Sequence, residues 1–167
     1  MAGPSHGYDL HQRFVIELGS VWHLSQSQAY AILKRLENHG DVSSQIIEQE
    51  KLPPRQKLRI TTAGRHRFMK WLENTTSHNS RSIRLEFLTR LYFVNLYHPE
   101  KNAAIYAAQC MEIKREIERL EQTLAQLPTE QTFNQLSLDL RLRQMKLIQD
   151  WMAEIKTQFH IAVEEIP

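Results

Sequence analysis

Two adjacent prolines, Pro53 and Pro54, constrain the fold of this chain most, because they interrupt a segment that otherwise has the pattern of two β-strands. The strand-like patterns cover residues 42–50 and 56–61. Proline has no N–H group to donate to a strand ladder, so two consecutive prolines fit only a loop. The segment therefore predicts a β-hairpin whose projecting tip, residues 51–55, is basic.

The charge pattern of this hairpin favours a polyanionic partner. In its second strand, Leu58 and Ile60 are expected to face inward, while Lys57 and Arg59 face solvent. Residues 51–72 contain seven Lys or Arg and no Asp or Glu, although the whole chain carries a net charge of only +2. Such a block is typical of a surface that binds nucleic acid.

Two helices are predicted before the hairpin. Residues 8–18 place their apolar side chains on one helix face. Ser25 and Gln28 have the spacing of a capping box, so a second helix is expected over residues 25–39, ending at Gly40. The inward face of this second helix is expected to consist of Ala29, Ile32, Leu33 and Leu36.

The outward side of the second helix carries hydrogen-bonding side chains near its N-terminus: Gln26, Ser27, Tyr30 and Lys34. A helix pair with such side chains has what a helix-turn-helix needs to read bases in a major groove. Helix, turn, helix and basic hairpin together have the order of a winged helix. The wing would be the hairpin over residues 43–60, and it would reach the phosphate backbone or an adjacent minor groove.

A third helix is expected after the hairpin, capped by Thr61 or Thr62. A polar stretch without periodicity follows it. We therefore expect a DNA-binding domain over residues 1–74, a linker over residues 75–80 and a helical domain over residues 81–167. The fold class is mainly α with a small β-hairpin.

The second half of the chain has a helical pattern almost throughout. Prolines at positions 99 and 128 separate three helices, the last of which is expected over residues 130–163. Apolar residues recur from Ile113 to Leu127 at alternating spacings of four and three, which is a heptad seam. Because the first domain cannot cover helices this long, a homodimer is expected. The expected dimerisation residues are Ile113, Ile117, Leu120, Leu124, Leu147, Trp151 and Ile155.

Three segments of the first domain resemble the PadR family of bacterial transcription regulators. They are Gly-Pro-Ser-His-Gly-Tyr-Asp-Leu over residues 3–10, Tyr-Ala-Ile-Leu-Lys-Arg-Leu-Glu over residues 30–37, and Arg-Ile-Thr-Thr-Ala-Gly over residues 59–64. Taken together and in this order they are fairly specific, and they cover residues 3 to about 73. The C-terminal half is similar to the helical dimerisation region of the family by pattern only.

The resemblance implies a homodimer that binds a pseudo-palindromic DNA operator, usually represses, and releases DNA in response to a small effector or another signal. Tyr30 matches the tyrosine of the family's recognition helix, which is expected at the DNA backbone, and Gln26, Ser27 and Gln28 occupy positions expected near bases. Candidate phosphate contacts come from the helix and the wing: Lys34, Arg55, Lys57 and Arg59.

The chain departs from the family at its start. The family places an apolar helix before the Gly-Pro-x-His-Gly turn, and here only Met1 and Ala2 precede it. We therefore expect this first helix to be missing. Either the sequence is a truncated start or fragment, or a different element covers the apolar side chains of Leu10 and Phe14.

Other function classes receive little support from the sequence. A single cysteine, Cys110, cannot form an internal disulfide, and the eight histidines have no metal-ligand spacing, so neither a metal nor a cofactor is expected. No phosphate-binding loop or nucleophile elbow suggests an enzyme. Without an apolar run long enough for a membrane span, a cytoplasmic location is expected. The remaining alternative is a helical homodimeric interaction or scaffold protein that does not bind DNA.

Overall fold

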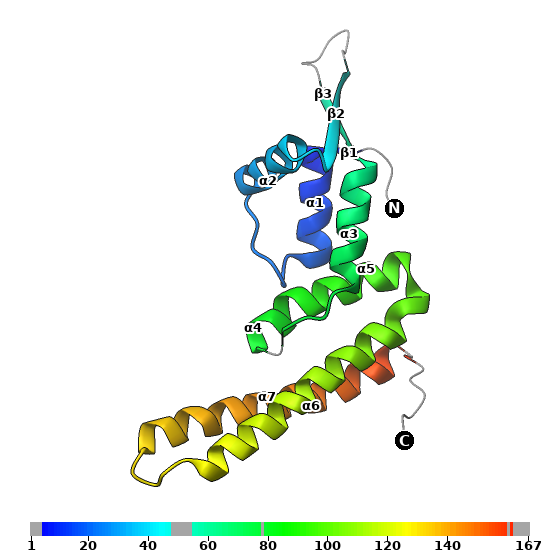
Figure 1. Cartoon of the computed structure of the whole chain (residues 1–167). Coiled ribbons are helices and arrows are strands. Elements are labelled where there is room, and N and C mark those ends of the chain that lie inside the picture. Colours follow the sequence, from blue (N-terminus) through cyan, green and yellow to red (C-terminus); the bar gives the residue numbers. More distant parts are fainter. Residues whose placement is uncertain (1–4, 48–54, 78, 160, 162–167) are drawn as a thin grey trace. The chain divides into compact units, whose positions relative to one another are not determined.

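The computed structural model of the chain describes residues 5–47, 55–77, 79–159 and 161 (Figure 1). The chain divides into two compact units, Met1–Asn74 and Thr75–Pro167. The first unit contains helices α1 (Gly7–Leu18), α2 (Gln26–Asn38) and α3 (Thr62–Glu73). Strands β2 (Val42–Ile47) and β3 (Arg55–Ile60) form a hairpin between α2 and α3. This order confirms the predicted winged helix-turn-helix.

The hairpin register confirms the predicted alternation of its second strand. Antiparallel pairing runs from Val42 opposite Ile60 to Ile47 opposite Arg55. Leu58 is buried and Arg59 is exposed, because successive side chains of a strand point to opposite faces. The predicted basic tip lies mostly at residues 51–54, which fall outside the described residues.

A third strand, β1 (Ser5–His6), was not predicted. It pairs antiparallel with β3, with Ser5 opposite Leu58, and gives a sheet of order β1-β3-β2. Two residues are too few to show an alternating pattern in the sequence. The strand forms because β3 offers it a free edge, which is a property of the folded hairpin.

The loop between α2 and β2 anchors the start of α3. Thr61 caps α3, since its Oγ1 accepts a hydrogen bond from the N–H of Gly64 at 3.0 Å and donates to the carbonyl oxygen of Gly40 at 2.7 Å. The Thr61 N–H donates to the carbonyl oxygen of Asp41 at 3.0 Å, and the Asp41 carboxylate pairs with Arg67. The cap predicted from the sequence is therefore confirmed, and it ties three elements together.

The second unit is helical. A helix begins at α4 (Ser80–Ser82), passes through a π-helical segment, η1 (Ile83–Phe87), and continues as α5 (Leu88–Tyr97). A short 3-10 turn, η2 (Pro99–Lys101), leads into α6 (Asn102–Gln126), and α7 (Thr132–Gln158) follows. The predicted breaks at positions 99 and 128 are thus confirmed. None of the helices in the described ranges is long and apolar enough to cross a membrane.

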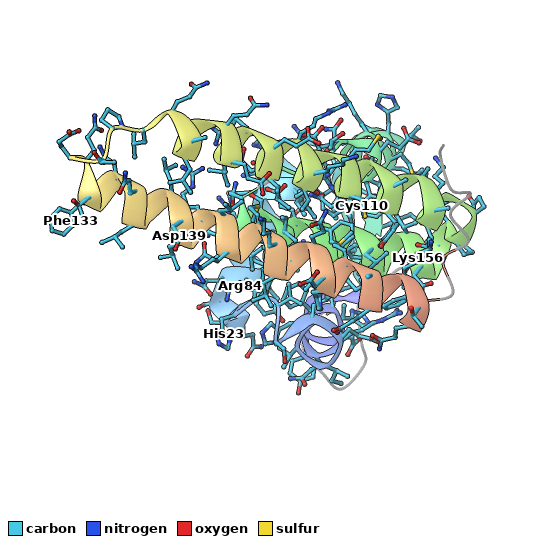
Figure 2. The ribbon with its side chains drawn as sticks, turned by 90° about the horizontal axis from the view of Figure 1, so that it is seen from below. His23, Arg84, Cys110, Phe133, Asp139 and Lys156 are labelled. Carbon is cyan, nitrogen blue, oxygen red and sulfur yellow. The ribbon has the colours of Figure 1, made fainter. Side chains whose placement is uncertain are left out.

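Helices α6 and α7 lie side by side and antiparallel, and their apolar faces form the core of the second unit (Figures 1 and 2). The heptad seam that we expected between two chains packs inside this hairpin instead. Six of the seven expected dimerisation residues belong to this core or pack against it: Ile113, Ile117, Leu120, Leu124, Trp151 and Ile155. Only Leu147 points to solvent, with 70% of its surface exposed. A heptad pattern specifies an apolar helix face and not whether its partner belongs to the same chain.

Ion pairs fix the register of the α6–α7 hairpin. The carboxylate of Glu116 is only 3% exposed, and it accepts two hydrogen bonds from Arg119 at 2.7 Å and one from Arg141 of α7 at 3.1 Å. Lys146 of α7 pairs with Glu121 of α6 at 2.7 Å. Because a buried carboxylate is stable only when it is paired, Glu116 favours one alignment of the two helices.

The thiol of Cys110 is half-buried on α6, and this burial raises its pKa. We expect it to react with iodoacetamide near neutral pH several-fold more slowly in the folded protein than in urea, because the thiolate is the reactive form. A matched control is Met111→Cys in a Cys110→Ala background, since Met111 is exposed on the same helix. That cysteine should react as fast as in the unfolded chain. Equal rates for folded and unfolded Cys110 would contradict the expectation.

Candidate nucleic-acid interface

The N-terminus of α2 is built by the predicted capping box. The Ser25 hydroxyl accepts a hydrogen bond from the N–H of Gln28 at 3.3 Å, and the Gln28 side-chain oxygen accepts one from the N–H of Ser25 at 2.9 Å. Ala29 is buried beneath this cap. The side-chain oxygen of Gln28 therefore caps its own helix, while the residue stays exposed, and its expected approach to bases stays a prediction.

The outer face of α2 carries the remaining helix residues that we expected at DNA. Gln26, Ser27, Tyr30 and Lys34 are all exposed. Arg35 and Asn38 lie further along the exposed face and were not singled out from the sequence. The helical period could have found Asn38, because it stands four residues after Lys34.

Tyr30 lies directly over the start of α1. A Cβ atom added at Gly7 would be 2.8 Å from Cε1 of Tyr30, so the absence of a side chain at Gly7 lets the ring lie there. Tyr30 and Lys34 also border a hollow of about 640 Å³ between the start of α1, α2 and β3. Its other walls come from His6, Gly7, Tyr8, Asp9, Leu33, Glu37, Gln56 and Leu58.

Glu37 connects α2 to the hairpin. Its carboxylate accepts a hydrogen bond from the hydroxyl of Ser44 on β2 and another from Nε2 of Gln56 on β3, at 3.4 Å. The hairpin thus has a defined orientation relative to the outer face of α2. The two surfaces can therefore act on one ligand together.

The outer face of the hairpin is polar and basic. Ser43 lies opposite Arg59 and Gln45 lies opposite Lys57, and directly opposed residues point to the same side of a sheet. These four residues and Ser44 line a shallow groove of about 280 Å³. Ser43 and Gln45 were missed from the sequence, although the alternation of their strand could have shown them. The backbone of Arg55 opens β3, while its side chain lies outside the described part of the chain.

The basic residues of α2, the hairpin and α3 include both paired and unpaired side chains. Arg67 is paired with the carboxylate of Asp41, which stabilises the fold. Among the described residues, the structure pairs none of Lys34, Lys57 and Arg59 with a carboxylate. Unpaired cations on neighbouring faces of a helix and a hairpin suit the phosphates of a nucleic-acid duplex. In the same described ranges, no group of three or more His, Cys, Asp or Glu side chains could hold a metal ion.

Comparison with known proteins points to one family. Residues 1–70 match the family described as "Transcriptional regulator PadR-like family". The negative transcriptional regulator PadR of Bacillus subtilis is 25% identical over 109 residues, which is 64% of this chain and 58% of that protein. The chain thus spans somewhat more than half the length of this curated relative.

Solved structures are similar at lower identity. Bacillus subtilis PadR in complex with operator DNA is 22% identical, with 94% of this chain and 90% of that chain covered and a TM-score of 0.44. The same protein in complex with p-coumaric acid is 21% identical, with 95% and 89% covered and a TM-score of 0.39.

Proposed function

We infer that this chain, whose residues 1–70 match the PadR-like family of transcriptional regulators, is a member of that family and a sequence-specific DNA-binding regulator that represses transcription as a homodimer. In this proposal α2 enters the major groove of a pseudo-palindromic operator, and the β2–β3 hairpin contacts the flanking backbone as a wing. The protein has no catalytic activity and acts in the cytoplasm. The repressor role is proposed because the curated Bacillus subtilis relative is a negative regulator.

One observation carries the proposal: Glu37 joins α2 to the hairpin, and the outer faces of both elements carry polar or basic side chains, of which Gln26 and Arg59 are exposed and Lys57 is half-buried. The helix supplies hydrogen-bonding groups at Gln26 and Ser27, and the hairpin supplies the charges of Lys57 and Arg59. Phosphate contacts position a protein on DNA, and contacts with base edges give specificity. The hydrogen-bonding groups of α2 therefore suit contacts with base edges, and the positive charges of the hairpin suit contacts with phosphates.

We propose in addition that a small molecule releases the protein from DNA, with its identity open. Bacillus subtilis PadR has been solved with p-coumaric acid. In this chain the hollow of about 640 Å³ beside α2 has the volume of a small-molecule site. A molecule bound there would touch Tyr30 and Lys34 and so compete with DNA.

The test is fluorescence anisotropy with duplex DNA over a series of salt concentrations. Each lost phosphate contact should reduce the slope of log affinity against log salt by about 0.9, so Arg59→Ala should reduce it by about 2 in a homodimer. Arg81→Ala removes the same charge from an exposed position of the second unit and should leave the slope unchanged. Tyr30→Ala should weaken binding to every sequence, whereas Gln26→Ala should change the preference among operator variants.

Two outcomes would count against the proposal. Gln26→Ala binding every operator variant as the parent does would remove the base-reading role of α2. Parent protein that shows no salt-sensitive DNA binding would favour the alternative, a helical interaction protein, for which the exposed apolar residues of α7 are the specific observation.

A further inference from the structure

The imidazole of His11 on α1 is hydrogen-bonded to the residue that comes directly before the cap of α2. Its Nε2 lies 2.9 Å from the carbonyl oxygen of Leu24. A carbonyl oxygen can only accept a hydrogen bond, so Nε2 carries the proton and donates it. The next residue, Ser25, caps α2. The side chain of His11 therefore attaches the first turn of α2 to α1.

The other hydrogen bonds of the loop between α1 and α2 act at its two ends. At the start of the loop, the N–H groups of Val21 and Trp22 donate to the carbonyl oxygen of Leu18, both at 2.9 Å. At its end, Ser25 and Gln28 bond to each other, which closes the cap without joining it to α1. Residues 22–25 have no regular secondary structure (Figure 1). The bond from His11 attaches this irregular segment to a rigid helix.

The second nitrogen of the His11 ring shows what the histidine contributes. Within the part of the chain that the structure describes, Nδ1 of His11 is buried and has no hydrogen-bond partner. A buried polar atom without a partner lowers stability. A leucine would fill the same half-buried position without this cost. The property that histidine adds at this position is therefore the Nε2 donor and its bond to Leu24.

A second contact holds α2 against α1 further along the helix. Gly7 stands four residues before His11 on α1, and a Cβ atom added there would lie 2.8 Å from Cε1 of Tyr30. The two contacts thus lie on either side of Gln26 and Ser27, the side chains proposed to read bases. Because α2 is rigid, its attachment at both places determines where Gln26 and Ser27 lie relative to α1.

We infer that His11 is a positioning residue for base recognition, which holds the first turn of α2 in place without touching DNA. The inference rests on the proposed function, in which α2 enters the major groove. A recognition side chain must be held within about 0.5 Å of its productive geometry. Phosphate contacts carry no sequence information. Loss of the His11 bond should therefore reduce the preference for a specific sequence more than it reduces binding to arbitrary DNA.

The first experiment is amide hydrogen exchange, which needs no DNA. The N–H groups of Gln28 and Ala29 donate to Ser25, so their exchange reports the opening of the first turn of α2. In His11→Leu these amides should exchange about fivefold faster, which is the effect expected for one lost hydrogen bond. The amide of Arg65 in α3 should exchange as in the parent. Unchanged exchange at Gln28 and Ala29 would overturn the inference.

Two further variants separate the hydrogen bond from the loss of the ring. His11→Gln keeps an N–H donor at a similar distance from the backbone and should restore slow exchange. His23→Leu removes an exposed imidazole from the same loop and should leave the exchange unchanged. A His11→Gln variant that exchanges as fast as His11→Leu would count against the bond. Nitrogen NMR of the parent should show the Nε2–H tautomer of His11, and a ring protonated only at Nδ1 would contradict the inference.

The effect on DNA binding is measured by fluorescence anisotropy with two duplexes of equal length. One duplex is selected by the parent protein from a random pool, and the other is random in sequence. The ratio of the two affinities should fall about fivefold in His11→Leu and recover in His11→Gln. The slope of log affinity against log salt on the random duplex should stay parental, because the phosphate contacts are unchanged. Equal weakening on both duplexes, or an unchanged ratio, would overturn the positioning role.

These measurements distinguish the inference from the proposed function. A parent that prefers the selected duplex, together with a His11→Leu variant of the same preference, would leave the regulator standing and discard the role of His11. Faster exchange in His11→Leu, in a chain whose parent shows no salt-sensitive DNA binding, would confirm the bond to Leu24 and discard the DNA-binding function.

Discussion

Replacing Leu120 with glutamate is expected to lower the free energy of unfolding of the second unit by about 4 kcal/mol or more. Leu120 is fully buried between α6 and α7, so the new carboxylate would lie in an apolar environment. It would also stand one helical turn from the buried carboxylate of Glu116, which repels it. Urea unfolding followed by circular dichroism measures the change.

Met111→Glu is the matched control, because the same charge is introduced at an exposed position of the same helix. Its free energy of unfolding should change by less than about 0.5 kcal/mol. If the seam containing Leu120 joined two chains instead of two helices of one chain, Leu120→Glu would give a folded monomer. A folded monomer of parental stability would therefore contradict the packing described here.

The second large effect is expected for Gly64→Ala. A Cβ atom at this position would lie 2.0 Å from the carbonyl oxygen of Asp41, and backbone atoms cannot move aside as a flexible side chain can. We expect a loss of about 3 kcal/mol, typical of severe overpacking. Ordinary helix propensity predicts the opposite sign, because alanine stabilises a helix by about 1 kcal/mol relative to glycine.

Ala63→Gly distinguishes the two causes. Ala63 is exposed at the neighbouring position of α3. The free energy of unfolding of this variant should therefore fall by only about 1 kcal/mol, which is the difference in helix propensity between alanine and glycine. Thermal unfolding gives the order of stabilities, and hydrogen exchange at the Thr61 amide, which donates to Asp41, reports the local opening. A Gly64→Ala variant more stable than the parent would show that α3 does not approach Asp41 this closely.

Much of the candidate DNA surface could be predicted because its signals are local. The capping box at Ser25, the alternation around Leu58 and the cap at Thr61 each involve residues within a few positions of one another. Local signals do not assign a role to the side chain of Gln28, since the same side chain can cap a helix or reach a base. The alternation of β2 could have shown that Ser43 and Gln45 share one face, but only the pairing register places them beside Arg59 and Lys57.

In the second half of the chain, helical periodicity identified apolar residues but did not predict which of them pack within the chain. The sequence grouped Leu147 with Trp151 and Ile155 on one side of the last helix. In the structure Ile155 lies in the core, Trp151 packs against it and Leu147 points to solvent. Helix α7 has two apolar faces, and periodicity does not say which of them meets α6. The answer depends on the α6–α7 turn and on the ion pairs of Glu116.

The order of the elements, most of their ends and the basic character of the hairpin follow from local sequence signals, because prolines, caps and side-chain alternation act over a few residues. Three outcomes depend instead on the folded chain: the element against which each apolar face packs, the basic residues that are paired within the fold, and the addition of β1 to the sheet. Those outcomes depend on contacts between residues far apart in the chain, such as Arg67 with Asp41 and Arg141 with Glu116. A pattern within one element specifies a surface, whereas the fold specifies what covers it.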